Sequence, residues 1–163
     1  MDKLYGRYLT VLLNEILSSF IATLGFGILF NIKGKNLIFA SFGGTLGWIV
    51  YKITLSYGLN EIPAMFISSI IFSIYSEICA RFLKTPVTTL VICALIPLVP
   101  GGGMYYTMYE AIQGNIIASL NKALTTISAA GALALGVIFV STITRLINSA
   151  RKKYYFKSKR LNY

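Results

Sequence analysis

The fold of this chain is decided by the stretch IPLVPGGGMYY, residues 96–106. It lies in an apolar run with no charged residue from Pro86 to Tyr109, and a helix needs about 20 apolar residues to cross a bilayer. The stretch holds two prolines, which lack a backbone N–H, followed by three glycines, whose backbone no side chain restrains. We therefore expect a membrane-spanning segment whose helix is broken at the Pro-Gly-Gly-Gly stretch.

The broken segment has two interpretations. Broken backbone at membrane depth is tolerated only where it is buried in protein or lines a wet cavity, because unpaired polar groups are costly in hydrocarbon. In transporters, the N–H groups of the half-helix that follows a break face anionic substrate groups. Residues 100–103 would then form part of a substrate path. Alternatively, they form a Pro-Gly turn just outside the membrane, which ends one helix and begins an interfacial one.

The composition places the chain among integral membrane proteins. Of its 163 residues, 56% are hydrophobic and 12% are charged, whereas about a quarter of a soluble domain is charged. We predict an all-α fold, a polytopic membrane helix bundle of about five transmembrane helices. Residues 1–150 would form one membrane domain, and residues 151–163 a basic cytoplasmic tail, because the chain is too short for a second folded domain.

The apolar runs place four further spans, at residues 8–30, 37–55, 62–82 and 123–144. Small residues recur every four positions in two of these spans, which is typical of helices that pack closely. The predicted helix-packing residues are Gly43, Gly47, Ser128, Ala132 and Gly136. The Gly43–Gly47 pair could instead form a dimer face.

The positive charge is concentrated at one end of the chain. The net charge is +10, and six of the fifteen basic residues lie in the tail, namely Arg151, Lys152, Lys153, Lys157, Lys159 and Arg160. Such a cluster beside a membrane helix favours contact with anionic lipid on the cytoplasmic side, and no other feature favours nucleic acid. The same rule places residues 33–35 and 81–84 inside, and residues 57–61 and 104–122 outside. The N-terminus would then lie outside, although it is basic.

A few charged residues fall within or near the spans. Glu77 and Arg81 are four residues apart and share a helix face, so they could form an ion pair near the membrane boundary. Glu77 could instead carry a proton or cation, and Glu110 is a second candidate for proton coupling unless it is a solvated acid at headgroup level. Lys52 is expected to extend its long stem to the interface.

No catalytic or metal chemistry is expected from the sequence. The chain has no histidine, and its two cysteines, Cys79 and Cys93, lie in apolar surroundings without metal-ligand spacing. No motif combines a nucleophile with a base. We therefore expect no metal, no cofactor and no enzymatic activity, and we interpret both cysteines as packing residues.

Several stretches together resemble the threonine/serine exporter family. Residues 94–106, ALIPLVPGGGMYY, resemble its IP-x-x-PG…Y signature, and residues 40–48, ASFGGTLGW, resemble its glycine-rich second span. The segments 57–60 and 81–86 also resemble the family, so the likeness covers nearly the whole chain except the tail. One departure is that three glycines follow Pro100, where family members often have other small residues, so a looser backbone is expected there.

The resemblance implies a multi-pass protein of the bacterial plasma membrane that exports threonine and serine, driven by the proton gradient. Some members of the family are split into two chains, and this one resembles the small chain. It would act with a larger exporter subunit, as a homo-oligomer, or both. A split pair of the family is associated with succinate export, so the implied substrate is a small molecule that bears a carboxylate.

The implied substrate-binding residues are the prolines that break the helix, the glycines whose N–H groups would face a carboxylate, and hydroxyl donors: Pro97, Pro100, Gly101, Gly102, Gly103, Tyr105, Tyr106 and Thr107. The alternative is a structural or assembly subunit whose partner chain carries the substrate path. In that case the small-residue stripes would be the main functional surfaces.

Overall fold

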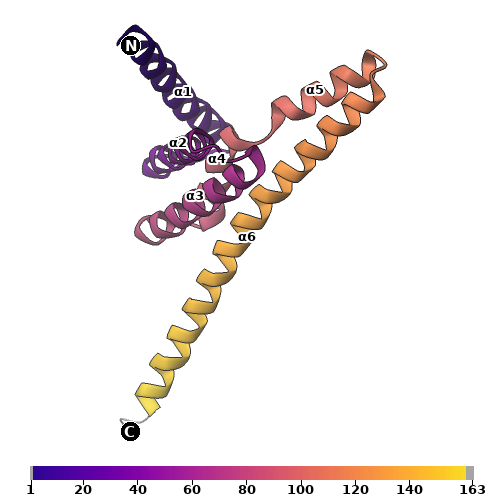
Figure 1. The fold of residues 1–163 in the computed structure, drawn as a ribbon. Helices are drawn as coiled ribbons and strands as arrows, with labels where there is room; N and C mark the ends of the chain where they lie inside the picture. Colours follow the sequence, from indigo (N-terminus) through magenta and orange to yellow (C-terminus); the bar gives the residue numbers. More distant parts are fainter. Residues whose placement is uncertain (1, 161–163) are drawn as a thin grey trace.

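The computed structural model describes the backbone of residues 2–160 and the side chains of residues 10–150. All described elements are helices (Figure 1). They are α1 (Asp2–Leu29), α2 (Lys35–Ser56), α3 (Glu61–Leu83), α4 (Val87–Leu95), the 3₁₀ helix η1 (Ile96–Leu98), α5 (Gly101–Ile112) and α6 (Ile116–Arg160). The predicted all-α class is confirmed.

Four of the described helices are long and apolar enough to cross a membrane. These segments are Thr10–Leu29, Lys35–Ser56, Glu61–Leu83 and Ile116–Ala150. A fifth span results if Val87–Leu98 and Gly101–Ile112, which meet at a bend of 48°, are taken as one broken span. Each part is about 18 Å long at 1.5 Å per residue, which is long enough to cross about half of a bilayer. The prediction of about five spans with a broken fourth is confirmed.

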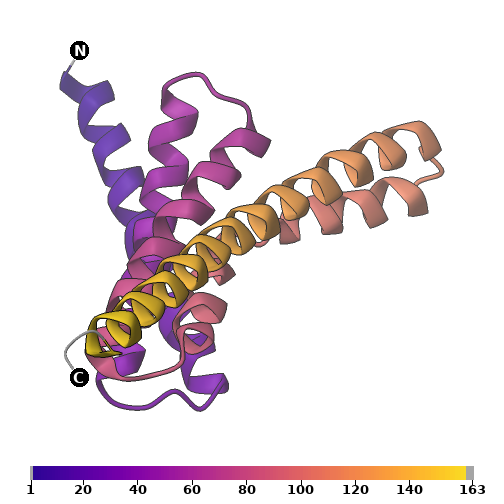
Figure 2. The same cartoon turned by 90° about the horizontal axis from the view of Figure 1, so that it is seen from below.

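The helices form a bundle with a projecting hairpin. Helices α1 to α4 gather together, and α6 passes them diagonally and packs along α3 (Figure 1). Helix α5 packs against the first part of α6, and the two project away from the bundle (Figure 2). No residue of α5 is buried. The bent span thus begins inside the bundle and ends in this hairpin.

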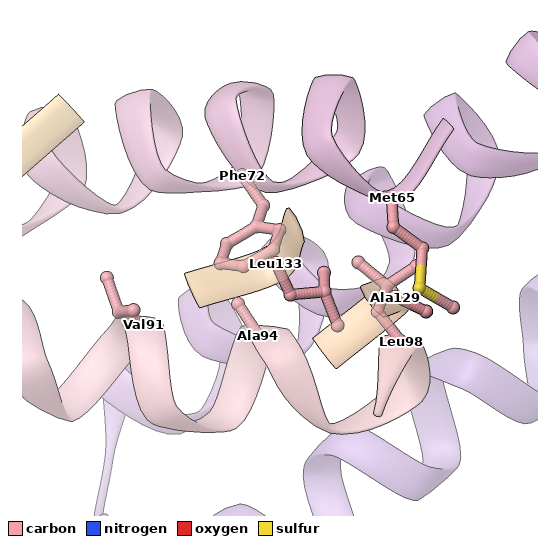
Figure 3. Packing of buried hydrophobic residues seen from close by; sticks show 7 residues of the cluster. All are labelled: Met65, Phe72, Val91, Ala94, Leu98, Ala129 and Leu133. Atoms are coloured by element: carbon pink, nitrogen blue, oxygen red, sulfur yellow. The ribbon is translucent and has the colours of Figure 1, made fainter. Parts of the chain in front are cut away.

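The main core joins α3, α4, η1 and α6 (Figure 3). Its buried side chains are Met65, Phe72, Val91, Ala94, Leu98, Ala129 and Leu133. Phe72 and Leu98 are at most 1% exposed, and Leu98 belongs to the 3₁₀ turn. The break in the fourth span is therefore held by packing within the protein. Cys79 and Cys93 are free and buried in a second cluster, which confirms them as packing residues.

Helix α6 extends beyond the predicted last span at both ends. It has 45 residues, which corresponds to about 67 Å at 1.5 Å per residue, whereas the hydrocarbon core is about 30 Å thick. Its described backbone continues through the basic segment to Arg160. Arg81 of α3 donates a hydrogen bond of 3.4 Å to Oδ1 of Asn148 of α6, so the end of α3 lies beside the start of the basic segment.

Two glycines of α2 allow close packing within the chain. A Cβ atom at Gly43 would lie 3.2 Å from Ala94 and Tyr75, and one at Gly47 would lie 3.1 Å from Leu98. The GxxxG face of α2 therefore contacts α3, α4 and η1.

The small residues of α6 lie in different environments. Gly136 contacts α3, where an added Cβ would overlap the side chain of Ser69 and approach the carbonyl oxygen of Phe66 to 3.0 Å. Ala132 is 8% exposed and thus buried, whereas Ser128 is exposed. The buried face of α6 instead includes Ala129, one residue further along the chain.

Candidate functional site

The break in the fourth span falls at residues 96–100. Proline lacks an N–H and clashes with the carbonyl four residues earlier, so Pro97 and Pro100 both interrupt the helical hydrogen-bond ladder. The chain bridges the gap with a bond of 3.3 Å from the Val99 N–H to the Ile96 carbonyl and one of 2.7 Å from the Gly101 N–H to the Val99 carbonyl. The three glycines that follow are helical, because α5 begins at Gly101. The break therefore lies ahead of them.

An open groove of about 410 Å³ lies against this break. Its lining residues come from one face of α1, from α2 and from η1: Val11, Asn14, Glu15, Ser18, Ser19, Ala22, Trp48 and Pro97. The α1 wall covers eleven helical steps, which corresponds to about 16 Å along the helix. Among the predicted substrate-binding residues, Pro97 is the one that lines the groove.

A charged pair joins α1 to α2 at the groove. The Nζ atom of Lys52 lies 3.0 Å from both carboxylate oxygens of Glu15. The side chains of Lys52 and Glu15 are 30% and 29% exposed. The ammonium group of Lys52, which is expected to extend toward the interface, thus binds the carboxylate of a neighbouring helix.

Sequence reasoning missed this pair, although a signal was present. Glu15 and Lys52 are each the one charged residue in their predicted spans, residues 8–30 and 37–55. Ionisable residues in membrane helices usually pair with one another, because an unpaired charge is costly there. That rule could have linked the two.

A smaller hollow of about 70 Å³ adjoins the groove. Its lining consists of Leu12, Glu15, Ile16, Trp48, Ile49, Lys52 and Ile53. Glu15 and Trp48 line both spaces, so these two side chains lie at the boundary between the groove and the hollow. The indole Nε1 atom of Trp48 is buried and has no hydrogen-bond partner in the described structure. The groove wall thus includes the Glu15 carboxylate, whose cation Lys52 lines the adjoining hollow, and the Trp48 side chain.

The predicted glycines of α5 differ in their surroundings. A Cβ atom at Gly101 or Gly102 would meet no other atom within 4 Å. At Gly103 it would overlap the side chain of Thr126 on α6. The hydroxyl of Thr107 donates a hydrogen bond of 2.8 Å to the Gly103 carbonyl. Gly101 and Gly102 are therefore open to their surroundings, whereas Gly103 and Thr107 are engaged within the hairpin.

The tyrosines and Glu110 lie on the hairpin. Tyr105 and Tyr106 are exposed, and the Nζ atom of Lys122 lies 5.9 Å from the centre of the Tyr106 ring. Glu110 accepts a hydrogen bond of 2.8 Å from the side-chain amide of Asn115. Tyr106, Glu110 and Lys122 line a separate hollow of about 280 Å³, together with Ala118. The structure does not bring these residues together with Pro97 in the groove.

The predicted ion pair between Glu77 and Arg81 is wrong. Glu77 is half-buried on α3, and no described ion pair joins it to Arg81. The guanidinium of Arg81 instead donates to Asn148 on α6. Arg81 therefore binds a residue of another helix instead of Glu77, which lies four residues before it on the same helix. Within residues 10–150, no three acidic or cysteine side chains lie together so that they could hold a metal ion.

Comparison with known proteins assigns the family. No solved structure matches this chain. The family model described as threonine/serine exporter, ThrE, matches residues 15–143, a range that begins at Glu15 and includes the break and most of the membrane-spanning part of α6. These residues make up most of the chain, and the helical bundle fits a transport protein of the membrane. The chain belongs to the threonine/serine exporter (ThrE) family.

Proposed function

We propose that this chain is a membrane subunit of a secondary exporter for a small amino acid or carboxylate. Threonine and serine are the first candidates, and succinate is a further one. The observation that carries the proposal is the groove of about 410 Å³, which has the broken helix at Pro97 on one side and the charged Glu15 on the other. Membership of the family supports export as the direction of transport.

The groove suits a substrate path for a physical reason. Irregular backbone is stable at membrane depth where it lines a wet cavity, and transporters bind substrates where a membrane helix is interrupted. The groove also offers polar groups on an otherwise apolar wall, namely Asn14, Ser18 and Glu15. Gly101 and Gly102 follow the break and have room beside them, so their N–H groups remain candidates for contact with a carboxylate.

The proposed location is the bacterial plasma membrane, with residues 1–150 as the membrane domain and residues 151–163 in the cytoplasm. The hydrogen bond between Arg81 and Asn148 supports this orientation, because it places two basic regions at the same end of the bundle. Val11 lies near the other end of the first span, so the groove would open toward the outside. Fused after residue 163, a reporter that works only in the cytoplasm should be active, and one that works only in the periplasm should be inactive. The opposite result would mean that the C-terminus lies outside.

Coupling to protons and a larger partner subunit complete the proposal. Glu77 and Glu110 remain the candidates for proton coupling, and neither lines the groove. Five spans are few for a transporter with a closed path, so the open groove needs a cover. A larger exporter subunit or a second copy of this chain would provide it.

An assembly subunit is the second candidate function. It is favoured by the hairpin, because no residue of α5 is buried within the described chain and its apolar side chains face outward. The hairpin could bind a partner chain that carries the substrate path itself.

The test is efflux of labelled threonine, serine and succinate from preloaded vesicles. One set would contain this chain alone, and the other would also contain a candidate larger subunit. Gradient-dependent efflux that is lost with a groove-blocking Ser18→Phe variant, but kept with Leu17→Phe, would support the proposal. Ser18 lines the groove, whereas the neighbouring Leu17 is 59% exposed and does not line it. Efflux from the two-subunit set that both variants leave unchanged would favour the assembly role.

A further inference from the structure

The ion pair between Glu15 and Lys52 lies where a ligand in the groove can reach it. Glu15 lines both the groove and the adjoining hollow, and Lys52 lines the hollow. The side chains of Lys52 and Glu15 are 30% and 29% exposed, and of the two carboxylate oxygens Oε2 is the buried one. The lysine ammonium sits on a flexible four-carbon stem, so it can follow a new partner over a few ångströms.

Neither charge can remain alone in these surroundings. Both residues belong to helices long and apolar enough to span a membrane, where a charge that loses its partner is unfavourable. A ligand can therefore separate the pair only if it supplies a replacement for each side. A molecule with one ammonium and one carboxylate group does this, because one ion pair becomes two and no charge is left unpaired.

We propose that the Glu15–Lys52 pair determines which ligands the groove accepts, by exchanging its internal ion pair for two pairs with the ligand. The ligand's ammonium takes the place of the Lys52 Nζ atom at the Glu15 carboxylate. The released Nζ atom then binds the ligand's carboxylate. The inference rests on the proposed function in one respect, namely that the substrate binds in the groove.

The neighbours of the pair fit this exchange. The side chain of Trp48 lines both spaces, and its Nε1–H group is buried and has no hydrogen-bond partner among the side chains and backbone that the structure describes. Asn14 and Ser18 add polar groups on the α1 wall near Glu15. With a volume of about 410 Å³, the groove has room for a small ligand.

The exchange predicts a ranking of ligands by charge. An N-acylated amino acid lacks the ammonium, so it would leave Glu15 without a partner. An amino-acid ester lacks the carboxylate, so it would leave Lys52 without one. A dicarboxylate would place a second negative charge beside Glu15. All three should bind at least about tenfold more weakly than the parent amino acid, because each leaves a charge unpaired or opposed.

The fluorescence of Trp48 can report ligand binding, because Trp48 is the one tryptophan in the sequence and it lines the groove. Its fluorescence would be titrated in the full chain, reconstituted in lipid nanodiscs, with threonine, threonine methyl ester and N-acetylthreonine. We expect threonine to bind most tightly to the wild type. Lys52→Met should shift the preference to the methyl ester, and Glu15→Gln should shift it to N-acetylthreonine. A purely structural pair would not produce these opposite shifts.

A double variant is the control for misfolding of the single variants. Glu15→Gln combined with Lys52→Met leaves no unpaired charge, so it should fold, and it should lose the preference for threonine over its two analogues. An unchanged preference in the double variant would overturn the inference, as would the absence of any Trp48 response to threonine in the wild type. If vesicles with the double variant still export threonine at the wild-type rate, the inference fails while the proposed function stands. If wild-type vesicles export none of the candidate substrates, the proposed function fails.

Discussion

The hydroxyl of Ser68 on α3 donates a hydrogen bond of 2.5 Å to the backbone carbonyl of Gly47 on α2. The contact is possible because Gly47 has no side chain, so α2 and α3 approach closely. Leu98 of the broken segment packs against the same glycine. Gly47 immediately precedes Trp48, which lines the groove, so this junction positions one wall of the groove relative to the break.

Enlarging Gly47 should destabilise the bundle. Gly47→Leu would place a side chain where Leu98 and Phe72 already lie within about 3.2 Å of an added Cβ atom. Overpacking of this kind typically lowers the free energy of unfolding by about 1–3 kcal/mol. The check is thermal unfolding in detergent, with Gly25→Leu as the control, because no atom lies within 4 Å of a Cβ atom at Gly25. Equal unfolding temperatures for the two variants would show that Gly47 is not a packing site.

Replacing each of two glycines of α6 by alanine should change the free energy of unfolding in opposite directions. Gly136→Ala would press against Ser69 and the Phe66 carbonyl, and should lower the free energy of unfolding by about 1–3 kcal/mol. Gly131→Ala has open space around it and should raise that free energy by up to about 1 kcal/mol, through better helix propensity. The comparison needs only thermal unfolding of two single variants. A change of stability in the same direction for both would contradict the close contact of Gly136 with α3.

The glycines after the break should separate transport from folding. Gly102→Leu has room for its side chain, so the protein should fold and assemble normally, while export falls to background. Gly103→Leu would collide with Thr126 and should reduce the amount of folded protein as well. Size-exclusion profiles and threonine efflux, measured on the same preparations, distinguish the two effects. Wild-type export by Gly102→Leu would remove the α5 N-terminus from the substrate path.

Proton coupling should be traceable to one acidic side chain. If Glu77 or Glu110 carries the coupled proton, the corresponding glutamine variant should export threonine at a rate that no longer depends on the proton gradient. Efflux would be measured with the gradient imposed and after a protonophore collapses it. Gradient dependence that persists in both single variants and in the double variant would exclude these two residues as carriers.

The sequence predicted local features better than contacts between distant residues. The break at Pro97 and Pro100 follows from the missing N–H groups and the clashes of proline itself, so it needs no knowledge of the tertiary structure. The pairing of Lys52 with Glu15 joins residues 37 positions apart, and no spacing rule indicates it. Arg81 likewise binds Asn148 on another helix instead of Glu77.

The buried face of α6 shows the same limit. A four-residue repeat of small side chains includes Ser128, yet Ser128 is exposed and Ala129 is buried. Which of the two faces the bundle depends on how α6 is rotated against α3. That rotation is set by contacts such as Gly136 with Ser69, which the sequence alone does not reveal.

The most direct test of the central claim is to block the groove and measure export. Ala22 lines the groove, whereas the adjacent Ile21 is 59% exposed and does not line it. Threonine efflux would be compared between vesicles with Ala22→Phe and Ile21→Phe, each with the subunits that support export by the wild type. If the groove is the substrate path, Ala22→Phe should reduce efflux to background while Ile21→Phe retains the wild-type rate. Equal efflux from the two variants would contradict the assignment of the substrate path to this groove.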